Sequence, residues 1–374
     1  MSMTKKERFL TAVKRKVPDV VPVSPLIHRR FAYKTLGEAD WKAVFKVHQM
    51  IGSIHFRGPI GVGVKAELPE GWAWKVRLIE QEGVRKVYEH VIETPLGKLI
   101  GKYVVGFNPK DPMVGTWKER LVKDAQDWEI YKSYWETWLK SPKEFDTIDA
   151  VEAYKYMGEE GVPSVGVGCV FSMLGEARGM YKLLLDLYRN YDTLREVHRV
   201  LTEVVKLHVK AFLQTPCEVL FYDICWATGA DLSPEHFKEL VLPDMAEAVK
   251  LVREKPGKFI GFYMLGRIRR HLPAIVELKP DFLETFEPNQ GDITLRGAKE
   301  LYGDKVCIMG NFDCNVLVFG GRKEVERETL RCLKEGMEGG GYVLVTGDEI
   351  PANAKLENLL TLVRTVEKYG RYRA

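Results

Sequence analysis

Residues 339–351, which read GGGYVLVTGDEIP, decide the fold of this chain. The apolar run from Tyr342 to Val345 is bounded by glycines, and short apolar runs of this kind are typical of buried strands in parallel sheets. Asp348 and Glu349 follow the predicted strand directly. An amphipathic helix is predicted next, from about Ala354 to Tyr369. Strand, exposed acid and helix together form the repeating unit of an α/β barrel, in which functional groups stand at the carboxyl ends of the strands.

Seven other apolar runs repeat this plan and alternate with segments of helical periodicity. The corresponding predicted strands are Val20–Ile27, Ile54–Phe56, Ser164–Phe171, Val219–Asp223, Phe259–Met264, Phe282–Phe286 and Val306–Met309. An open doubly wound sheet would usually carry a glycine-rich phosphate loop after its first strand, whereas the sequence there is His28-Arg29-Arg30. The sequence therefore predicts a (β/α)8 barrel, an α/β fold, with residues 1–374 forming a single domain.

One region, about residues 66–160, interrupts the alternation of strands and helices. Its first part alternates apolar and polar residues in three stretches, separated by turn signals at Gln81–Gly83 and Pro95–Gly97. Its second part is rich in tryptophan and tyrosine and is predicted to be mostly helical, for example from Asp124 to Trp138. We therefore expect a small antiparallel meander, followed by helices, inserted after the second barrel strand.

Composition limits the classes of partner. The chain carries 56 lysines and arginines against 52 aspartates and glutamates, a net charge of +4, and has no basic tract, so we expect no binding to nucleic acid. Its apolar runs are too short to span a membrane, and its polar N-terminus predicts no secretion signal. The six cysteines include no CxxC pair, which favours a reduced, cytoplasmic setting over a disulfide framework.

Polar and aromatic side chains gather at the predicted carboxyl ends of the strands, where barrels of this class carry out their chemistry. The candidate site residues are His28, Arg29, Arg30, Arg57, Asp223, Trp226, Tyr263, Glu287, Asn289, Asn311, Asp313, Asp348 and Glu349. This mixture suits a small polar or aromatic ligand with at least one anionic group. Any one of the residues also has a structural interpretation, because aspartate and asparagine favour turns and caps. Their repeated placement at strand ends is what favours a site.

Other chemistries find no support in the sequence. It contains no GxSxG elbow, no HExxH motif and no P-loop. No cluster of histidine and cysteine has the spacing of metal ligands.

Several motifs resemble those of the uroporphyrinogen decarboxylase superfamily, which also contains cobamide-dependent methyltransferases. The resemblance covers nearly the whole chain. It rests on TKKERFLTAV at 4–13, PDVVPV at 18–23, ETPLG at 93–97, Tyr222-Asp223 with Gly229, LSPEHF at 232–237 with Pro243, GNFD at 310–313, and residues 339–351. The resemblance implies a distorted TIM barrel, in agreement with the predicted strands.

The chain departs from the decarboxylase branch of this superfamily. Those enzymes carry an Arg-Gln-Ala-Gly-Arg segment after the first strand, which holds porphyrinogen carboxylates, whereas the sequence here is His28-Arg29-Arg30-Phe31-Ala32. They also carry a histidine in the turn after the last strand, where this chain has Asp348. The resemblance therefore does not imply porphyrinogen decarboxylation.

The chain also departs from the zinc-dependent methyltransferases of the superfamily. They use His-x-Cys-Gly after strand five and a cysteine after strand eight, and the matching positions here are Tyr263, Leu265 and Asp348, with Gly266 kept. Leucine cannot bind zinc, so we expect no zinc through these ligands and no metal site. A carboxylate-rich set elsewhere could still bind zinc.

Branches without the zinc motif are similar to enzymes that move methyl groups among methoxyarenes, corrinoid proteins and pterins. The first hypothesis is therefore O-demethylation, in which a methoxylated aromatic acid gives its methyl group to a corrinoid carried by a partner protein. Asp348, Tyr263 or Glu287 would protonate or polarise the ether oxygen. The remaining candidates would bind substrate, with Arg29, Arg30 or Arg57 on its carboxylate and Trp226 beside its ring.

Three alternatives stay open. A methylcorrinoid:tetrahydropterin methyltransferase would use Asp223, Asn289, Asn311 and Asp313 to bind the edge of a pterin. A decarboxylase of a different substrate and a non-catalytic binding module are the others. In each case the expected ligand is a small molecule, and a homodimer is possible.

Overall fold

The computed structural model describes residues 2–56, 60–108 and 112–372. Its centre is a sheet of six parallel strands in the spatial order β12-β11-β10-β9-β8-β7. The strands correspond to the last six predicted ones. Their bounds are β7 Ser164–Gly168, β8 Val219–Asp223, β9 Phe259–Tyr263, β10 Phe282–Thr285, β11 Cys307–Phe312 and β12 Tyr342–Thr346.

Two extended segments, the first two predicted strands, join the edges of this sheet. Val23 forms a parallel bridge with Leu344 of β12, and the amide of Ile54 donates a hydrogen bond to the carbonyl of Val23. His55 in turn forms a parallel bridge with Gly161, shortly before β7. Six strands and two extended segments thus make the predicted (β/α)8 arrangement.

These two segments differ from the regular strands that the sequence predicted. They form single bridges instead of ladders. Pro22 and Pro25 have no amide hydrogen, so a continuous ladder cannot form in the first segment, although the carbonyl of Pro22 accepts from Leu344. The second segment is only a few residues long.

Helices surround the barrel and connect its strands. The first, α1, begins with a capping box in which Thr4 and Glu7 satisfy each other's backbone amides. The helix bounds are α1 Lys5–Val13, α2 Arg29–Leu36, α3 Trp41–Ile51, α6 Val170–Arg178, α7 Met180–Arg189, α8 Tyr191–Leu213, α9 Pro234–Leu240, α10 Leu242–Arg253, α11 Leu272–Glu277, α12 Leu295–Tyr302, α13 Cys314–Phe319, α14 Arg322–Gly336 and α15 Leu356–Tyr369. None of the helices in the described ranges is both long and apolar enough to cross a membrane.

The region after β7 differs from its prediction. The strand ends at Gly168, not at Phe171, because Cys169 occupies the cap position of α6 and its sulfur accepts from the amide of Ser172. The helical segment that follows is divided into α6 and α7 at Gly179. That residue has a φ of 83°, a conformation that glycine adopts without steric cost.

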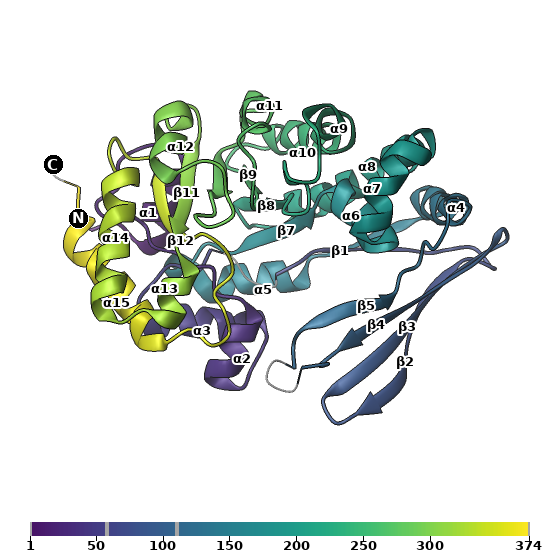
Figure 1. The fold of residues 1–374 in the computed structure, drawn as a ribbon, viewed down its shortest axis with the longest axis horizontal. Coiled ribbons are helices and arrows are strands. Elements are labelled where there is room, and N and C mark those ends of the chain that lie inside the picture. Colours follow the sequence, from purple (N-terminus) through teal and green to yellow (C-terminus); the bar gives the residue numbers. More distant parts are fainter. Residues whose placement is uncertain (1, 57–59, 109–111, 373–374) are drawn as a thin grey trace.

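The insertion is held to the barrel by a pair of short strands that the sequence did not predict, β1 (Gly63–Ala66) and β6 (Lys143–Asp146). Between them lies the predicted meander, with strands β2 Ala73–Glu82, β3 Arg85–Thr94 and β4 Gly97–Val105. A fourth strand that was not predicted, β5 Gly115–Glu119, pairs with β4 in the part expected to be mostly helical, and α4 Asp127–Lys140 follows. The short helices α5 (Ile148–Met157) and η1 (Gly158–Glu160) then lead back to β7. In Figure 1 the meander projects beside α4, away from both termini.

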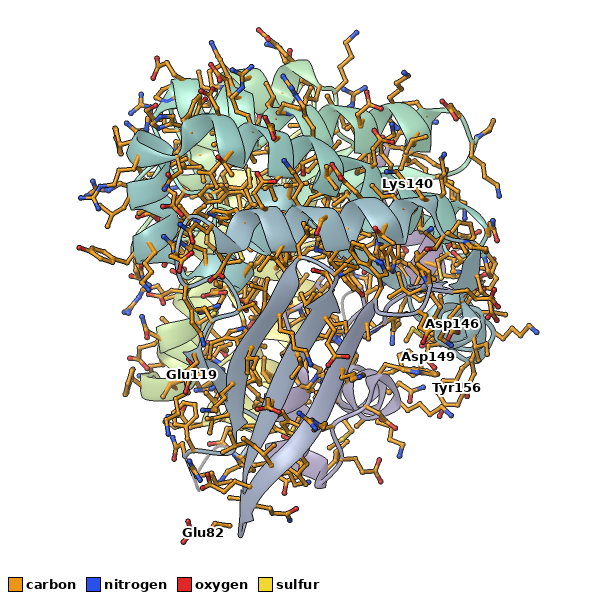
Figure 2. The ribbon with its side chains drawn as sticks, turned by 90° about the vertical axis from the view of Figure 1, so that its right-hand side faces the viewer. Glu82, Glu119, Lys140, Asp146, Asp149 and Tyr156 are labelled. Atoms are coloured by element: carbon orange, nitrogen blue, oxygen red, sulfur yellow. The ribbon has the colours of Figure 1, made fainter. Side chains whose placement is uncertain are left out.

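The two faces of the meander differ in chemistry. One face carries cross-strand ion pairs, such as Arg77 with Glu89 at 2.7 Å and Lys102 with Glu119 at 2.8 Å. The other face carries aromatic rings and packs against α4, where the rings of Trp74 and Trp135 lie 5.9 Å apart. Figure 2 shows α4, which ends at Lys140, crossing one end of the sheet, with Glu82 at the far tip. The insertion therefore presents an aromatic face at the end that meets α4.

Two clusters of buried apolar side chains form the core. The smaller one lies inside the barrel, where Phe282, Met309 and Val343 project from successive strands. Phe9 of α1 closes its amino end, with its ring 4.6 Å from that of Phe56. The larger cluster lies between the strands and the surrounding helices and extends into the insertion through residues such as Trp128. The carboxyl end of the barrel is left for polar residues.

Candidate active site

A cavity of about 390 Å³ lies at the carboxyl ends of β8, β9 and β12. We call it the polar cavity, because Asp223, Tyr263, Asp348 and Glu349 line it together with His28. The sequence analysis selected each of these residues, and they come from parts of the chain more than 300 residues apart. The position matches the catalytic face of α/β barrels.

Tyr263 and Asp348 form the central contact of the polar cavity. Tyr263 is the last residue of β9 and is only 7% exposed, and its hydroxyl donates to Oδ1 of Asp348 at 2.8 Å. Oδ1 also accepts from the amide of Glu349 at 2.6 Å. Both bonds fall on the same carboxyl oxygen, and Oδ2 makes no hydrogen bond within the described residues. The pair thus places a phenol and a carboxyl group where one ligand atom can meet both.

A looser cluster lies at the rim. His28 occupies the cap position of α2, and its Nδ1 is 3.4 Å from Oε1 of Glu349. Arg30 approaches the same oxygen at 3.8 Å. These side chains are 30–40% exposed, so the pairing is weakened by solvent. Arg29 is exposed and does not line the cavity. Arg57 lies outside the described residues.

Asp223 lines the polar cavity and also fixes its own loop. Its Oδ1 accepts from the amide of Cys225 at 2.8 Å, so the structural role expected of a strand-end aspartate holds as well. Cys225 lines the cavity too. Burial and the nearby Asp223 raise the pKa of the Cys225 thiol far above its usual value. The thiol stays protonated and is not a nucleophile.

Three other predicted site residues form a separate cluster after β10 and β11. The carboxylate of Glu287 accepts from the amides of Asn289 at 2.9 Å and Gln290 at 2.6 Å. Asn289 donates to Asp313 at 3.0 Å, and Asp313 caps α13 by accepting from Asn315 at 2.9 Å. Glu287, Asn289 and Asp313 do not line the polar cavity.

Asn311 and Trp226 are held by structural contacts. Asn311 is 2% exposed, and its amide donates to the carbonyl of Phe286 at 2.8 Å while accepting from Arg331 of α14 at 2.9 Å. Trp226 packs on α6 so closely that a Cβ at Gly175 would lie 2.6 Å from its ring. Neither residue lines the polar cavity.

Sequence reasoning missed Glu284, a carboxylate buried inside the barrel. It is 1% exposed and lies on β10 between Tyr263 of β9 and Met309 of β11 in the sheet register. Met309 belongs to the interior cluster, so Glu284 shares the inward face with Tyr263. The available signal was the position of Glu284 in the middle of the predicted strand Phe282–Phe286, because acids are seldom fully buried.

Sequence reasoning also missed a second cavity, of about 480 Å³, beside the first. We call it the aromatic cavity, because Trp74, Trp117, Tyr131 and Trp135 of the insertion form one wall. The carboxyl end of β7 forms the opposite wall. Gly166 lines both cavities, so they adjoin at this residue. The abundance of aromatic residues in the insertion was the available signal.

The positions that resemble zinc ligands do come together. Tyr263, Leu265 and Asp348 all line the polar cavity. Leucine offers no ligand atom, and within the described ranges no group of three or more histidine, cysteine, aspartate or glutamate side chains could hold a metal ion. The donor set does not fit zinc, which takes at least three protein ligands in catalytic sites.

Fold and cavity together define an α/β barrel protein with a cavity at the carboxyl ends of its strands. The family model described as uroporphyrinogen decarboxylase (URO-D) matches residues 147–369, more than half of the chain. The chain belongs to this family, as its motifs indicated.

Curated relatives are distant. The uroporphyrinogen decarboxylase of Aromatoleum aromaticum is 24% identical over 241 residues, which cover 60% of this chain and 64% of that protein. That of Coxiella burnetii is 23% identical over 194 residues, 49% of this chain and 50% of the other. This chain thus spans about half the length of the Coxiella relatives that it matches.

Among solved structures, a methyltransferase from Methanosarcina mazei is similar over 98% of this chain and 99% of that one, with a TM-score of 0.65 and 16% identity. At this identity the likeness shows the fold. The likeness extends over nearly the full length of both chains.

Proposed function

We propose that this protein is an enzyme that transfers the methyl group of a methoxylated aromatic compound to a corrinoid carried by a partner protein. The observation that carries the proposal is the Tyr263–Asp348 pair in the polar cavity, next to a cavity walled by aromatic rings. A proton source beside an apolar seat for a ring is what the cleavage of an aryl ether needs. The family and the fold are compatible with this activity.

The chemical difficulty lies in the leaving group. When the methyl carbon is attacked, the carbon–oxygen bond breaks and its electron pair stays on the aryl oxygen, so a phenolate leaves unless it receives a proton. The reduced corrinoid supplies the nucleophile for the methyl group. General acid catalysis by a positioned side chain typically accelerates such a step by about 100-fold or more.

We assign the proton to Asp348. The single hydroxyl hydrogen of Tyr263 is already directed at Oδ1, so a proton bound to Oδ2 is the one that can be given to the ether oxygen. Tyr263 then stabilises the carboxylate that remains after the transfer. Glu287 is a poorer candidate for the acid, because backbone amides occupy its carboxylate away from the cavity.

The composition of the polar cavity argues against a porphyrinogen. Within the described residues no lysine or arginine lines it, whereas Asp223, Asp348 and Glu349 do. A substrate with several carboxylates would therefore meet like charges. A volume of about 390 Å³ is also small for a tetrapyrrole. The polar cavity also fits a pterin less well, because Asn289, Asn311 and Asp313, which were expected to bind it, lie outside the cavity.

The test is an anaerobic assay with cob(I)alamin as the acceptor, followed by the loss of the Co(I) absorbance. Methoxyphenols and methoxybenzoates are supplied as donors, and methyltetrahydropterin and uroporphyrinogen are tested separately. We expect methyl transfer from a methoxyarene with release of the matching phenol. Transfer from the pterin alone, or decarboxylation of uroporphyrinogen alone, would contradict the proposal.

A further inference from the structure

The two cavities meet at β7, which carries two glycines, Gly166 and Gly168. Gly166 and Gly168 lie on the same face of β7, and a Cβ built on either would have no atom within 4 Å. Their place on β7 opposite Phe221 and Asp223 of β8 puts them on the face that looks into the polar cavity. The absent side chains thus leave open space where the two cavities adjoin.

Trp117 in the aromatic wall is held by several contacts. The indole nitrogen of Trp117 donates to Oε2 of Glu176 at 2.5 Å, and Arg120 binds the same oxygen at 3.0 Å. The ring of Trp117 also packs on His90 at 4.9 Å between centroids. A fixed ring loses little entropy when a flat ligand packs against it. The ring of Trp117 is therefore suited to contact with a planar apolar group.

Few polar groups of the aromatic cavity remain for a ligand. Glu176 is bound by Trp117 and Arg120, and the hydroxyl of Ser172 lies 3.2 Å from the sulfur of Cys169. His208 differs, because its Nδ1 donates to the carbonyl of Val204 at 3.0 Å. A carbonyl can only accept, so Nδ1 carries the hydrogen and Nε2 is an acceptor. Burial lowers the pKa of His208, which keeps the ring neutral.

We propose that the aromatic cavity seats the ring of a neutral methoxylated phenol, and that Gly166 is the position through which its methoxy group reaches Asp348. Trp117 packs on the ring, and Nε2 of His208 accepts from a ring hydroxyl. The transfer of the methyl group rests on the function proposed above, whereas the binding of the ring does not. Specificity for the donor is thus assigned to the insertion.

The first test measures binding without any corrinoid, by calorimetric titration with para-methoxyphenol. Trp117→Ala is expected to weaken binding about 10-fold, the scale of one lost aromatic contact with its buried area. Trp117→Phe should restore most of the affinity. Trp72→Ala, a half-buried tryptophan of the same region outside the cavity, is the matched control and should bind as the wild type does. The saturated analogue para-methoxycyclohexanol should bind more weakly than the phenol to the wild type.

The second test distinguishes the binding of the ring in the aromatic cavity from the passage of its methoxy group at Gly166. Gly166→Val places a branched side chain in empty space on a strand, so the variant is expected to fold. At saturating para-methoxyphenol it should transfer the methyl group to cob(I)alamin at least 10-fold more slowly than the wild type, because the new side chain separates the bound methoxy group from Asp348.

The outcomes test the ring-binding site and the passage at Gly166 separately. Failure of the wild type to bind para-methoxyphenol, or equal binding by Trp117→Ala, overturns the ring seat even if methyl transfer is observed. Transfer by Gly166→Val at the wild-type rate overturns the passage. Binding that depends on Trp117, without transfer to cob(I)alamin or to a corrinoid protein, keeps the seat and overturns the proposed function.

Discussion

The strand ends of β8, β9 and β12 differ from those of β10 and β11, although both sets carry acids and amides. At the first set, Tyr263 bonds to Asp348 across the cavity, between two strands far apart in sequence. At the second set, Glu287 and Asp313 bond mainly to amides two or three residues away. An acid at a strand end thus belongs to the site when its partner comes from another strand. An acid whose partners lie in its own loop acts as a cap, and it also belongs to the site only where it lines the cavity, as Asp223 does.

The largest expected effect is on Asp348. Asp348→Asn removes the acid and keeps the shape, so the turnover of methoxyarene with cob(I)alamin should fall by about 100-fold or more. Asp313→Asn, the matched change at the second set, should leave turnover within about threefold. Equal losses in the two variants would end the distinction between the two sets of strand ends.

Asn311 should affect stability and not the site. Asn311→Leu leaves the carbonyl of Phe286 without its donor and removes one acceptor of Arg331, so the free energy of unfolding should fall by about 2 kcal/mol. Denaturant unfolding measures this change. Asn289→Ala, an exposed position, should cost less than about 0.5 kcal/mol. A rise in the KM for methoxyarene in Asn311→Leu, without a loss of stability, would place Asn311 in the site after all.

Tyr263 should matter less than Asp348, because it supports the acid and does not give the proton. We expect Tyr263→Phe to lower kcat about 10-fold, the worth of one hydrogen bond to a charged group, with little change in KM. Steady-state kinetics of the two variants give the comparison. A larger loss in Tyr263→Phe than in Asp348→Asn would reverse the two roles.

The buried His55 should make the free energy of unfolding depend on pH. Burial holds the pKa of His55 down to about 3, whereas an unfolded histidine titrates near 6.5. Between these pH values the unfolded chain binds a proton at His55 that the folded chain does not. The contribution of His55 to the free energy of unfolding is therefore complete above about pH 6.5 and is lost as the pH falls. When the pH is lowered from about 7.5 to 5.5, His55 should lower the free energy of unfolding by about 1.4 kcal/mol. Denaturant unfolding of His55→Leu should show a flatter dependence on pH, and an unchanged slope would contradict this assignment.

Much of the fold could be predicted because it depends on local patterns. Apolar runs alternating with helical periodicity predicted the strand order along the chain, and the acidic pair after β12 marked the end of the barrel that holds the polar cavity. The irregular first two segments could have been foreseen from Pro22 and Pro25. The pair β1 and β6 could not, because it joins two short stretches about 80 residues apart.

The site could be predicted only in part, since residue type and strand end do not fix the direction of a side chain. Asp223, Tyr263 and Asp348 meet as expected, but Asn311 turns to Arg331 on an outer helix, which no local pattern reveals. The aromatic cavity combines Trp74, Trp135 and Gly166, which become neighbours only when the insertion packs on the barrel. Such sites are visible only in three dimensions.

We propose that this barrel moves a methyl group from an aryl ether, with Asp348 as the acid. The most direct measurement is a single turnover with para-methoxyphenol carrying an isotope-labelled methyl group, cob(I)alamin as acceptor, and Asp348→Asn and Asp313→Asn beside the wild type. We predict that the label appears in methylated cobalamin together with an equal amount of the demethylated phenol. The rate should be about 100-fold lower for Asp348→Asn and unchanged for Asp313→Asn. Label that stays on the aryl oxygen in the wild type, or transfer at the same rate in Asp348→Asn, would contradict the account.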